Sequence, residues 1–239
     1  MLHEIRDAVV QDANDSEGTG TWANVQAVES HVPAPSLTAA HYLRIASSQI
    51  EQRRSVQATL NTSPPQQFET TPAEHAESIR NLGRAVYLAT LMCFVQGLDV
   101  LERESQKEHW NVDIPRVLDI WKAGCIIKSD AILELFQASY SDGQHVHLLC
   151  APLIAKEARE HRASLKTVVL RGIAADAHLP CLSATLEYMK YMSSTDLPTS
   201  FTEAQLDSFG AHGYDLKSEA VRYLLKGKSS LLQDALGSD

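Results

Sequence analysis

The strongest constraint on the fold is a long run of apolar residues at helical spacing. Between residues 76 and 104, apolar side chains return every third or fourth position, at Ile79, Leu82, Val86, Ala89 and Cys93. This spacing places them along one face of an α-helix. Further apolar residues beside the stripe widen it, so we predict a helix that is buried on most of its circumference.

The start of this helix is marked by a capping motif. Thr71 is followed by Pro72 and by Glu74, which is the T-x-x-E pattern of a capping box with proline in the first turn. The preceding residues, Asn61 to Thr71, include Pro64-Pro65 and several threonines and offer little to bury. We predict a non-helical connector between two long helices.

Helical periodicity dominates the remaining chain, and alternating β patterns are scarce. Further helices are expected at about 23–32, 36–60, 112–123, 126–140, 144–160, 163–174, 181–192 and 215–236, with another opening at Ser200–Glu203. The sequence therefore predicts an all-α fold. We expect a single helical domain over 1–239, with a polar loop at 12–17, the connector at 61–71 and an amphipathic helical tail over 215–239.

Composition and charge exclude several classes of protein. The chain of 239 residues has a net charge of -9 and no cluster of lysine and arginine, which argues against binding nucleic acid. No apolar stretch approaches the ~20 residues of a membrane span, and the N-terminus has no apolar signal core. The cysteines Cys93, Cys125, Cys150 and Cys181 form no C-x-x-C pair. Buried free thiols in a reducing, cytoplasmic compartment are the expectation.

Several short motifs follow one another along the chain in an order that indicates a family. They are Gly18-Thr19-Gly20-Thr21-Trp22, Leu43-Arg44-Ile45-Ala46-Ser47-Ser48, Gln96-Gly97, Gly124-Cys125-Ile126-Ile127-Lys128-Ser129 and Phe209-Gly210-Ala211-His212. Over about Met1 to Tyr214, the chain resembles the C-terminal domain of 6-phosphogluconate dehydrogenase. The resemblance implies an all-α domain that forms a homodimer and one wall of a substrate cleft. It also implies that the chain stands alone, without the family's N-terminal NADP-binding Rossmann domain.

The resemblance also marks binding positions. Thr19, Arg44 and His212 match the groups with which the family binds the substrate phosphate. Two positions depart from the pattern, because Glu17 stands where the family has lysine and Leu206 where it has arginine. A single charge pair near a surface is worth ~4 kcal/mol at about 4 Å. We therefore expect phosphate binding to be much weakened and the ligand to be a non-phosphorylated small molecule.

The candidate site residues follow from these matches. We expect catalytic roles for Glu17, Arg44 and His212, and substrate-binding roles for Thr19, Trp22, Lys128 and Tyr214. Most of them have a structural alternative. Arg44 could pair with a carboxylate, His212 could cap a helix, Glu17 could be solvated, Thr19 could bond only to its own turn, Trp22 could pack in the core and Lys128 could extend from a helix to solvent. His145 and His147 would bind a metal only with a third ligand, and none is evident, so no metal is expected.

The sequence leaves three functions open. It has no G-x-G-x-x-G turn between a strand and a helix, so we expect no nicotinamide cofactor. The favoured hypothesis is a cofactor-independent cyclase, isomerase or lyase that uses the retained dimer-interface cleft. The alternatives are a half-enzyme that needs a separate Rossmann-domain partner, and an inactive dimeric interaction protein.

Overall fold

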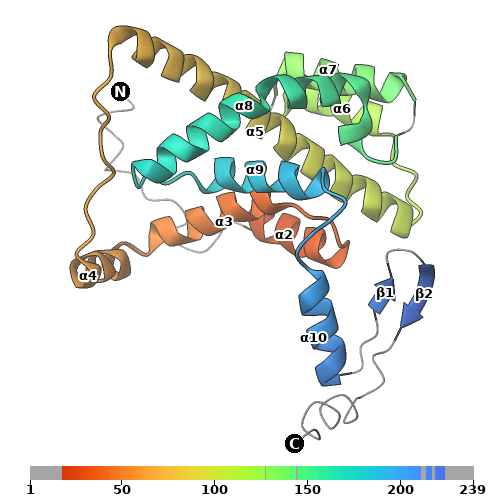
Figure 1. Ribbon diagram of the computed structural model, residues 1–239. Coiled ribbons are helices and arrows are strands. Elements are labelled where there is room, and N and C mark those ends of the chain that lie inside the picture. The colour runs from red at the N-terminus through yellow and green to blue at the C-terminus, as the bar shows by residue number, and fades with distance from the viewer. Residues whose placement is uncertain (1–17, 127, 144, 211–213, 217–218, 224–239) are drawn as a thin grey trace, which may run out of the picture. The chain divides into compact units, whose positions relative to one another are not determined.

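The computed structural model describes residues 18–126, 128–143, 145–210, 214–216 and 219–223 (Figure 1). The chain folds as two compact units, Met1–Lys190 and Tyr191–Asp239. The first unit, wherever it is described, is helical. The all-α fold class is thereby confirmed, while the single domain over 1–239 stays a prediction.

The first unit is built on the long helix α5, Pro72–Lys107. The predicted capping box is confirmed, since the Thr71 backbone N–H donates to Glu74 Oε2 at 2.8 Å and the Glu74 N–H donates to Thr71 Oγ1 at 3.3 Å. The residues from Leu88 to Leu98 supply much of the core. By length and composition α5 could cross a membrane. Its packing against other helices identifies it as a core helix of this unit.

The other helices pack on or beside α5. The largest contact is with α8, Pro152–Ala174, and α2, Thr19–Glu29, and α3, Pro35–Ser48, also contact α5. Helices α6, Ile114–Gly124, and α7, Asp130–Ser141, pair with each other, and α7 contacts α8. The short 3-10 helix η1, Leu148–Cys150, and α9, Pro180–Met192, complete this part. Figure 1 shows the α6–α7 pair on the other side of α5 from α2 and α3.

A buried polar network joins three of these helices. The Ser36 N–H on α3 donates to Gln96 Oε1 on α5 at 3.0 Å, and Gln96 Nε2 donates to Ser36 Oγ at 3.0 Å. Ser36 Oγ lies 2.9 Å from Thr185 Oγ1 on α9. Since Thr185 Oγ1 donates to the Cys181 carbonyl at 2.8 Å, Ser36 must donate to Thr185. The network also satisfies an N–H at the start of α3, where Ala34 gives no side-chain cap.

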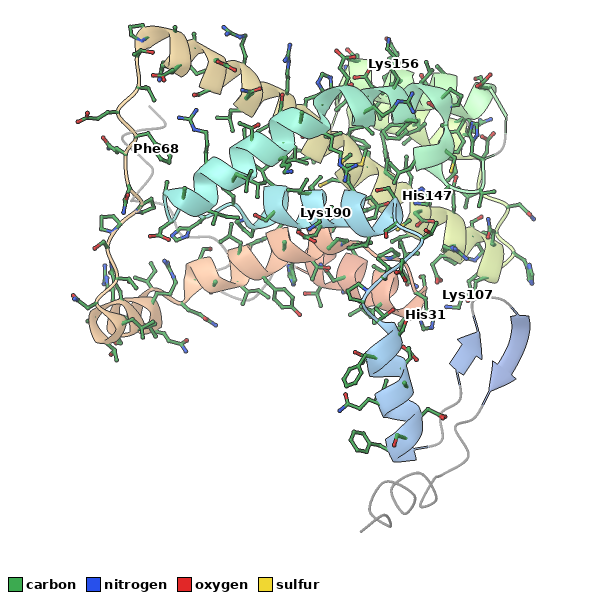
Figure 2. The ribbon with its side chains drawn as sticks, in the orientation of Figure 1. His31, Phe68, Lys107, His147, Lys156 and Lys190 are labelled. Atoms are coloured by element: carbon green, nitrogen blue, oxygen red, sulfur yellow. The ribbon has the colours of Figure 1, made fainter. Side chains whose placement is uncertain are left out.

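The connector predicted at 61–71 has no helix or strand. It follows α4, Ile50–Leu60, whose residues are all exposed except Ile50. The connector is fastened to α8, because the Gln66 N–H donates to the Ala175 carbonyl at 2.9 Å and the Phe68 ring lies 5.2 Å from the Arg171 guanidinium. Figure 2 labels Phe68 in this segment.

Several helix boundaries in the first unit differ from the predictions. The helix expected at 23–32 is α2, which begins four residues earlier at Thr19, and the helix expected at 126–140 is α7, which begins only at Asp130. The helix expected over 36–60 is two helices, because Gln49 has a ψ of 52° that interrupts the α conformation. The helices expected at 144–160 and 163–174 are one, α8, which begins only at Pro152. Proline is favoured in the first turn of a helix and disfavoured further in, so it sets this start.

The second unit contains helix α10, Ser200–Gly210, as expected, and then two strands. Strand β1, Tyr214–Leu216, pairs antiparallel with β2, Glu219–Tyr223, with Tyr214 opposite Tyr223. The predicted helix over 215–236 is therefore wrong for its described part, and residues 217–218 and 224–236 lie outside the described residues. Val221 and Tyr223 are strand-favouring residues at a spacing of two, and the leucines beside them resembled a helical stripe.

Candidate functional site

The Gly-Thr-Gly motif forms the first turn of α2 and lies against α3. Thr19 is the first residue of the helix and is exposed. A Cβ atom at Gly20 would stand 2.6 Å from His41 Nδ1 of α3, so a side chain at position 20 would have to displace the imidazole. Thr21 Oγ1 lies 3.4 Å from His41 Nε2. The glycine therefore permits a close approach of α2 to α3 at His41.

Arg44 lies one helical turn beyond His41 on α3. Residues three apart in a helix share a face, so the side of α3 that meets the start of α2 continues to Arg44, which is partly buried. Ser47 Oγ donates to the Arg44 carbonyl at 2.6 Å and supports the same turn. The fold thus gathers the motif and Arg44 on neighbouring parts of the α2–α3 pair. Sequence reasoning missed His41, which belongs to none of the motifs and is identified only by its closeness to Gly20.

Trp22 lies on the surface of α2. Its side chain is 70% exposed, so the alternative that it packs in the core is wrong. The indole covers Gly18, where an added Cβ would lie 2.8 Å from Cζ2. Val25 and Val28 on the same helix are also exposed. Stacking of Trp22 on a ligand stays a prediction.

Lys128 comes from a different part of the first unit. It is exposed in the turn between α6 and α7, where its N–H donates to the Cys125 carbonyl at 3.1 Å. That helix pair lies across α5 from α2 and α3 (Figure 1). The structure therefore does not group Lys128 with Thr19 and Arg44.

The remaining predicted residues are less fully described. Glu17 and His212 lie outside the described residues. Tyr214 begins β1, but only its backbone is described. Leu206, which replaces a family arginine, is half-exposed on α10 in the second unit. The roles proposed for these residues remain predictions.

The cysteines are free thiols, as expected, but they are not all buried. Cys150 is exposed, whereas Cys93, Cys125 and Cys181 are partly buried. Burial, with a smaller effect of Cys181, raises the pKa of Cys93 to about 11. A thiol with so high a pKa holds almost no thiolate at neutral pH, so Cys93 is unsuited to act as a nucleophile.

Comparison with known proteins finds the same family by its family model and by its individual members. Residues 3–228 match the family model described as "6-phosphogluconate dehydrogenase, C-terminal domain". The chain is 38% identical over 221 residues to a decarboxylating 6-phosphogluconate dehydrogenase of Emericella nidulans, covering 90% of this chain and 44% of that protein. It is 28% identical to the enzyme of the same description from Staphylococcus aureus, covering 91% of this chain and 46% of that protein.

A solved structure shares the fold. Plasmodium falciparum 6-phosphogluconate dehydrogenase superposes with a TM-score of 0.81 at 24% identity, over 90% of this chain and 45% of that one. At this identity the likeness shows the fold alone. The chain spans less than half the length of the curated relatives named above.

Proposed function

Because the chain belongs to the family of 6-phosphogluconate dehydrogenase C-terminal domains, we propose that it is the helical half of such a dehydrogenase. In this role it supplies one wall of a substrate cleft to a dinucleotide-binding domain. The match over residues 3–228 is the observation that carries the proposal. The meeting of the Gly-Thr-Gly turn with the Arg44 side of α3 supports it, since both belong to the motifs of the resemblance.

The chain's own residues do not fit a nicotinamide cofactor. The secondary-structure elements among the described residues of the first unit are all helices, whereas the dinucleotide fingerprint needs a strand followed by a glycine-rich turn. The sequence has no G-x-G-x-x-G motif at any strand. The hydride chemistry therefore belongs to the dinucleotide-binding domain, and this chain contributes substrate binding and position.

The cleft has a changed charge toward the substrate. The relatives are named for 6-phosphogluconate, and in this chain Arg44 supplies a guanidinium that suits a phosphate or a carboxylate. The resemblance implies a lysine at the position of Glu17, directly before the Gly-Thr-Gly motif. A sugar acid held mainly through Arg44 and Thr19 is the substrate class that fits, with 6-phosphogluconate bound weakly.

Dimer formation is part of the proposal. Exposed apolar side chains lie on α2, at Trp22, Val25 and Val28, and on the first half of α5, at Ile79 and Leu82. Contiguous exposed apolar patches commonly mark sites of protein–protein interaction. A homodimer would cover it. A purely structural dimer without a ligand has no separate observation in its favour, and a cytoplasmic location stays a prediction.

The cofactor-independent cyclase, isomerase or lyase expected from the sequence finds no support. The relatives reported above are dehydrogenases. The half-enzyme is accordingly the better interpretation of the same residues.

The proposal is tested by joining this chain to the part of the Emericella nidulans relative that it does not match. We expect the fused protein to bind 6-phosphogluconate in titration calorimetry, and Arg44→Met to weaken that binding by about tenfold or more. Arg54→Met is the matched control, because Arg54 is exposed on α4 and pairs with Glu51 of the same helix at 3.3 Å. Equal affinities for the two variants would contradict a binding role for Arg44.

A further inference from the structure

His147 stands directly before η1 and lies among three elements of the first unit. Its Nδ1 accepts from the Leu149 N–H at 3.0 Å and so caps η1. Its Nε2 lies 3.3 Å from Tyr188 Oη on α9 and 3.7 Å from Asp99 Oδ2 on α5. The side chain is 16% exposed, and Figure 2 labels it beside α9. The imidazole thus joins the start of η1 to α5 and α9.

These contacts fix the position of the proton on the neutral imidazole. A ring nitrogen that accepts a hydrogen bond carries no proton of its own. Because Nδ1 accepts from the Leu149 N–H, the neutral ring carries its proton on Nε2, where Tyr188 Oη and the Asp99 carboxylate can accept it. In this state both ring nitrogens have partners. The Leu149 N–H, which has no partner within η1, is also paired.

Protonation of His147 is incompatible with this cap. A protonated imidazole carries hydrogens on both nitrogens, so its Nδ1–H would face the Leu149 N–H across 3.0 Å. Two donors cannot form a hydrogen bond with each other, so either the ring or the start of η1 must move. The Asp99 carboxylate holds the ring in place, because the imidazolium lies 3.7 Å from it and forms an ion pair. The cap of η1 is therefore the contact that breaks.

The surroundings of the ring set the pH at which it gains the second proton. Burial lowers the pKa of His147, the charge of Asp99 raises it, and the charge of Arg103, one turn further along α5, lowers it. On the α9 side the titratable group that faces the ring is Tyr188. The imidazole is therefore neutral at pH 7 and becomes protonated below the ordinary histidine pKa of ~6.5.

The cap matters because η1 forms the junction between α7 and α8. Leu148 in η1 is buried, and Ala151, which stands between η1 and α8, is fully buried. η1 contacts both α5 and α8. Helix α8 has no side-chain cap of its own, since alanine stands at that position. Loss of the His147 cap therefore loosens the point at which the largest partner of α5 begins.

We propose that His147 is an acid-sensitive clasp. When neutral, it caps η1 and holds this segment to α5 and α9; when protonated, it stays paired with Asp99 and leaves η1 free to open. The clasp makes the local stability of the α7–α8 junction depend on pH. It uses neither the Gly-Thr-Gly motif nor Arg44, so it does not depend on the proposed role in a dehydrogenase.

Hydrogen exchange of the Leu149 amide, followed by NMR at pH 7.5 and pH 5, tests the clasp. We expect its protection factor, which corrects for the intrinsic exchange rate, to fall by about fivefold at pH 5, the usual effect of losing a cap. His147→Asn keeps an acceptor that does not titrate, and its Leu149 protection should be the same at both pH values. His178→Asn, at an exposed position, is the matched control and should behave as the wild-type protein does.

Three results would overturn the proposal. They are equal Leu149 protection at the two pH values in the wild-type protein, the same fall in His147→Asn as in wild type, or a neutral His147 ring that carries its proton on Nδ1. The nitrogen-15 chemical shifts of the imidazole, measured through the same pH range, report that tautomer directly. If His147→Asn fails to fold, these shifts and the wild-type protection factors decide the question.

Discussion

Replacing Gln96 by leucine tests how the first unit holds α3, α5 and α9 together. Gln96 is fully buried, and its amide accepts from the Ser36 N–H and donates to Ser36 Oγ, both at 3.0 Å. Leucine has nearly the same volume but no polar atom. The change therefore removes both hydrogen bonds while filling the space, and it leaves the buried Ser36 N–H without a partner.

The expected loss follows from these contacts. The lost hydrogen bond from Gln96 to Ser36 Oγ contributes about 1 kcal/mol net, and the Ser36 N–H that is left unpaired costs about 1–3 kcal/mol. Ser36 Oγ keeps its bond to Thr185, so the rest of the network survives. We expect the free energy of unfolding to fall by about 2–4 kcal/mol, which for a chain of this size corresponds to a drop of about 4–16 °C in Tm.

Urea and thermal unfolding, followed by circular dichroism, measure this loss. Gln106→Leu is the matched control, because Gln106 lies on the same helix and is exposed. We expect the control to stay within about 0.5 kcal/mol of the wild-type protein. A Gln96→Leu variant as stable as the control would refute the reasoning that this amide caps α3 and joins the helices.

Three further predictions concern charge and reactivity. In the protein fused to the dinucleotide-binding part of a relative, Glu17→Lys should strengthen 6-phosphogluconate binding by about tenfold or more, and Ser16→Lys should do less; equal effects would mean that position 17 has no special place beside the phosphate. Since burial raises the pKa of Glu102, the folded protein holds this proton more tightly than the unfolded chain does. The contribution of Glu102 to the free energy of unfolding is therefore fully present at low pH and is lost as the pH rises through the pKa of the folded state. Glu102→Gln should thus gain stability relative to wild type at pH 8 but not at pH 4, as urea unfolding at the two pH values can show, and a gain independent of pH would contradict this origin. Iodoacetamide labelling followed by mass spectrometry should modify the exposed Cys150 well before Cys93, whose pKa is raised to about 11; labelling of Cys93 first would show that its burial is transient.

Local signals predicted much of the helical fold. Helix α5 could be predicted because a capping box, a proline in the first turn and a wide apolar stripe all indicate a helix starting at the same place. The interruption at Gln49 was not predictable, since its neighbours continue a helical pattern. The late start of α8 is decided by Pro152. The tail was misread because paired leucines satisfy a helical stripe as readily as a strand.

The site was predictable only through the resemblance. Nothing local joins Thr19 to Arg44, which belong to different helices and share one region of the fold only because α2 and α3 pack together. Their neighbour His41 has no motif of its own, and its role is visible only from the space above Gly20. Lys128 was predicted as a substrate-binding residue because it belongs to one of the motifs of the resemblance. That motif lies in the α6–α7 turn, away from Thr19 and Arg44.

The central claim, that this chain is the substrate-binding half of a dehydrogenase, is tested most directly by measuring NADP+ reduction with 6-phosphogluconate. The account predicts no reduction by the chain alone. It predicts measurable reduction when the chain is joined to the dinucleotide-binding part of the Emericella nidulans relative, with a KM that rises in Arg44→Met. A folded fusion that binds NADP+ yet reduces none of it in the presence of the sugar acid would contradict the account.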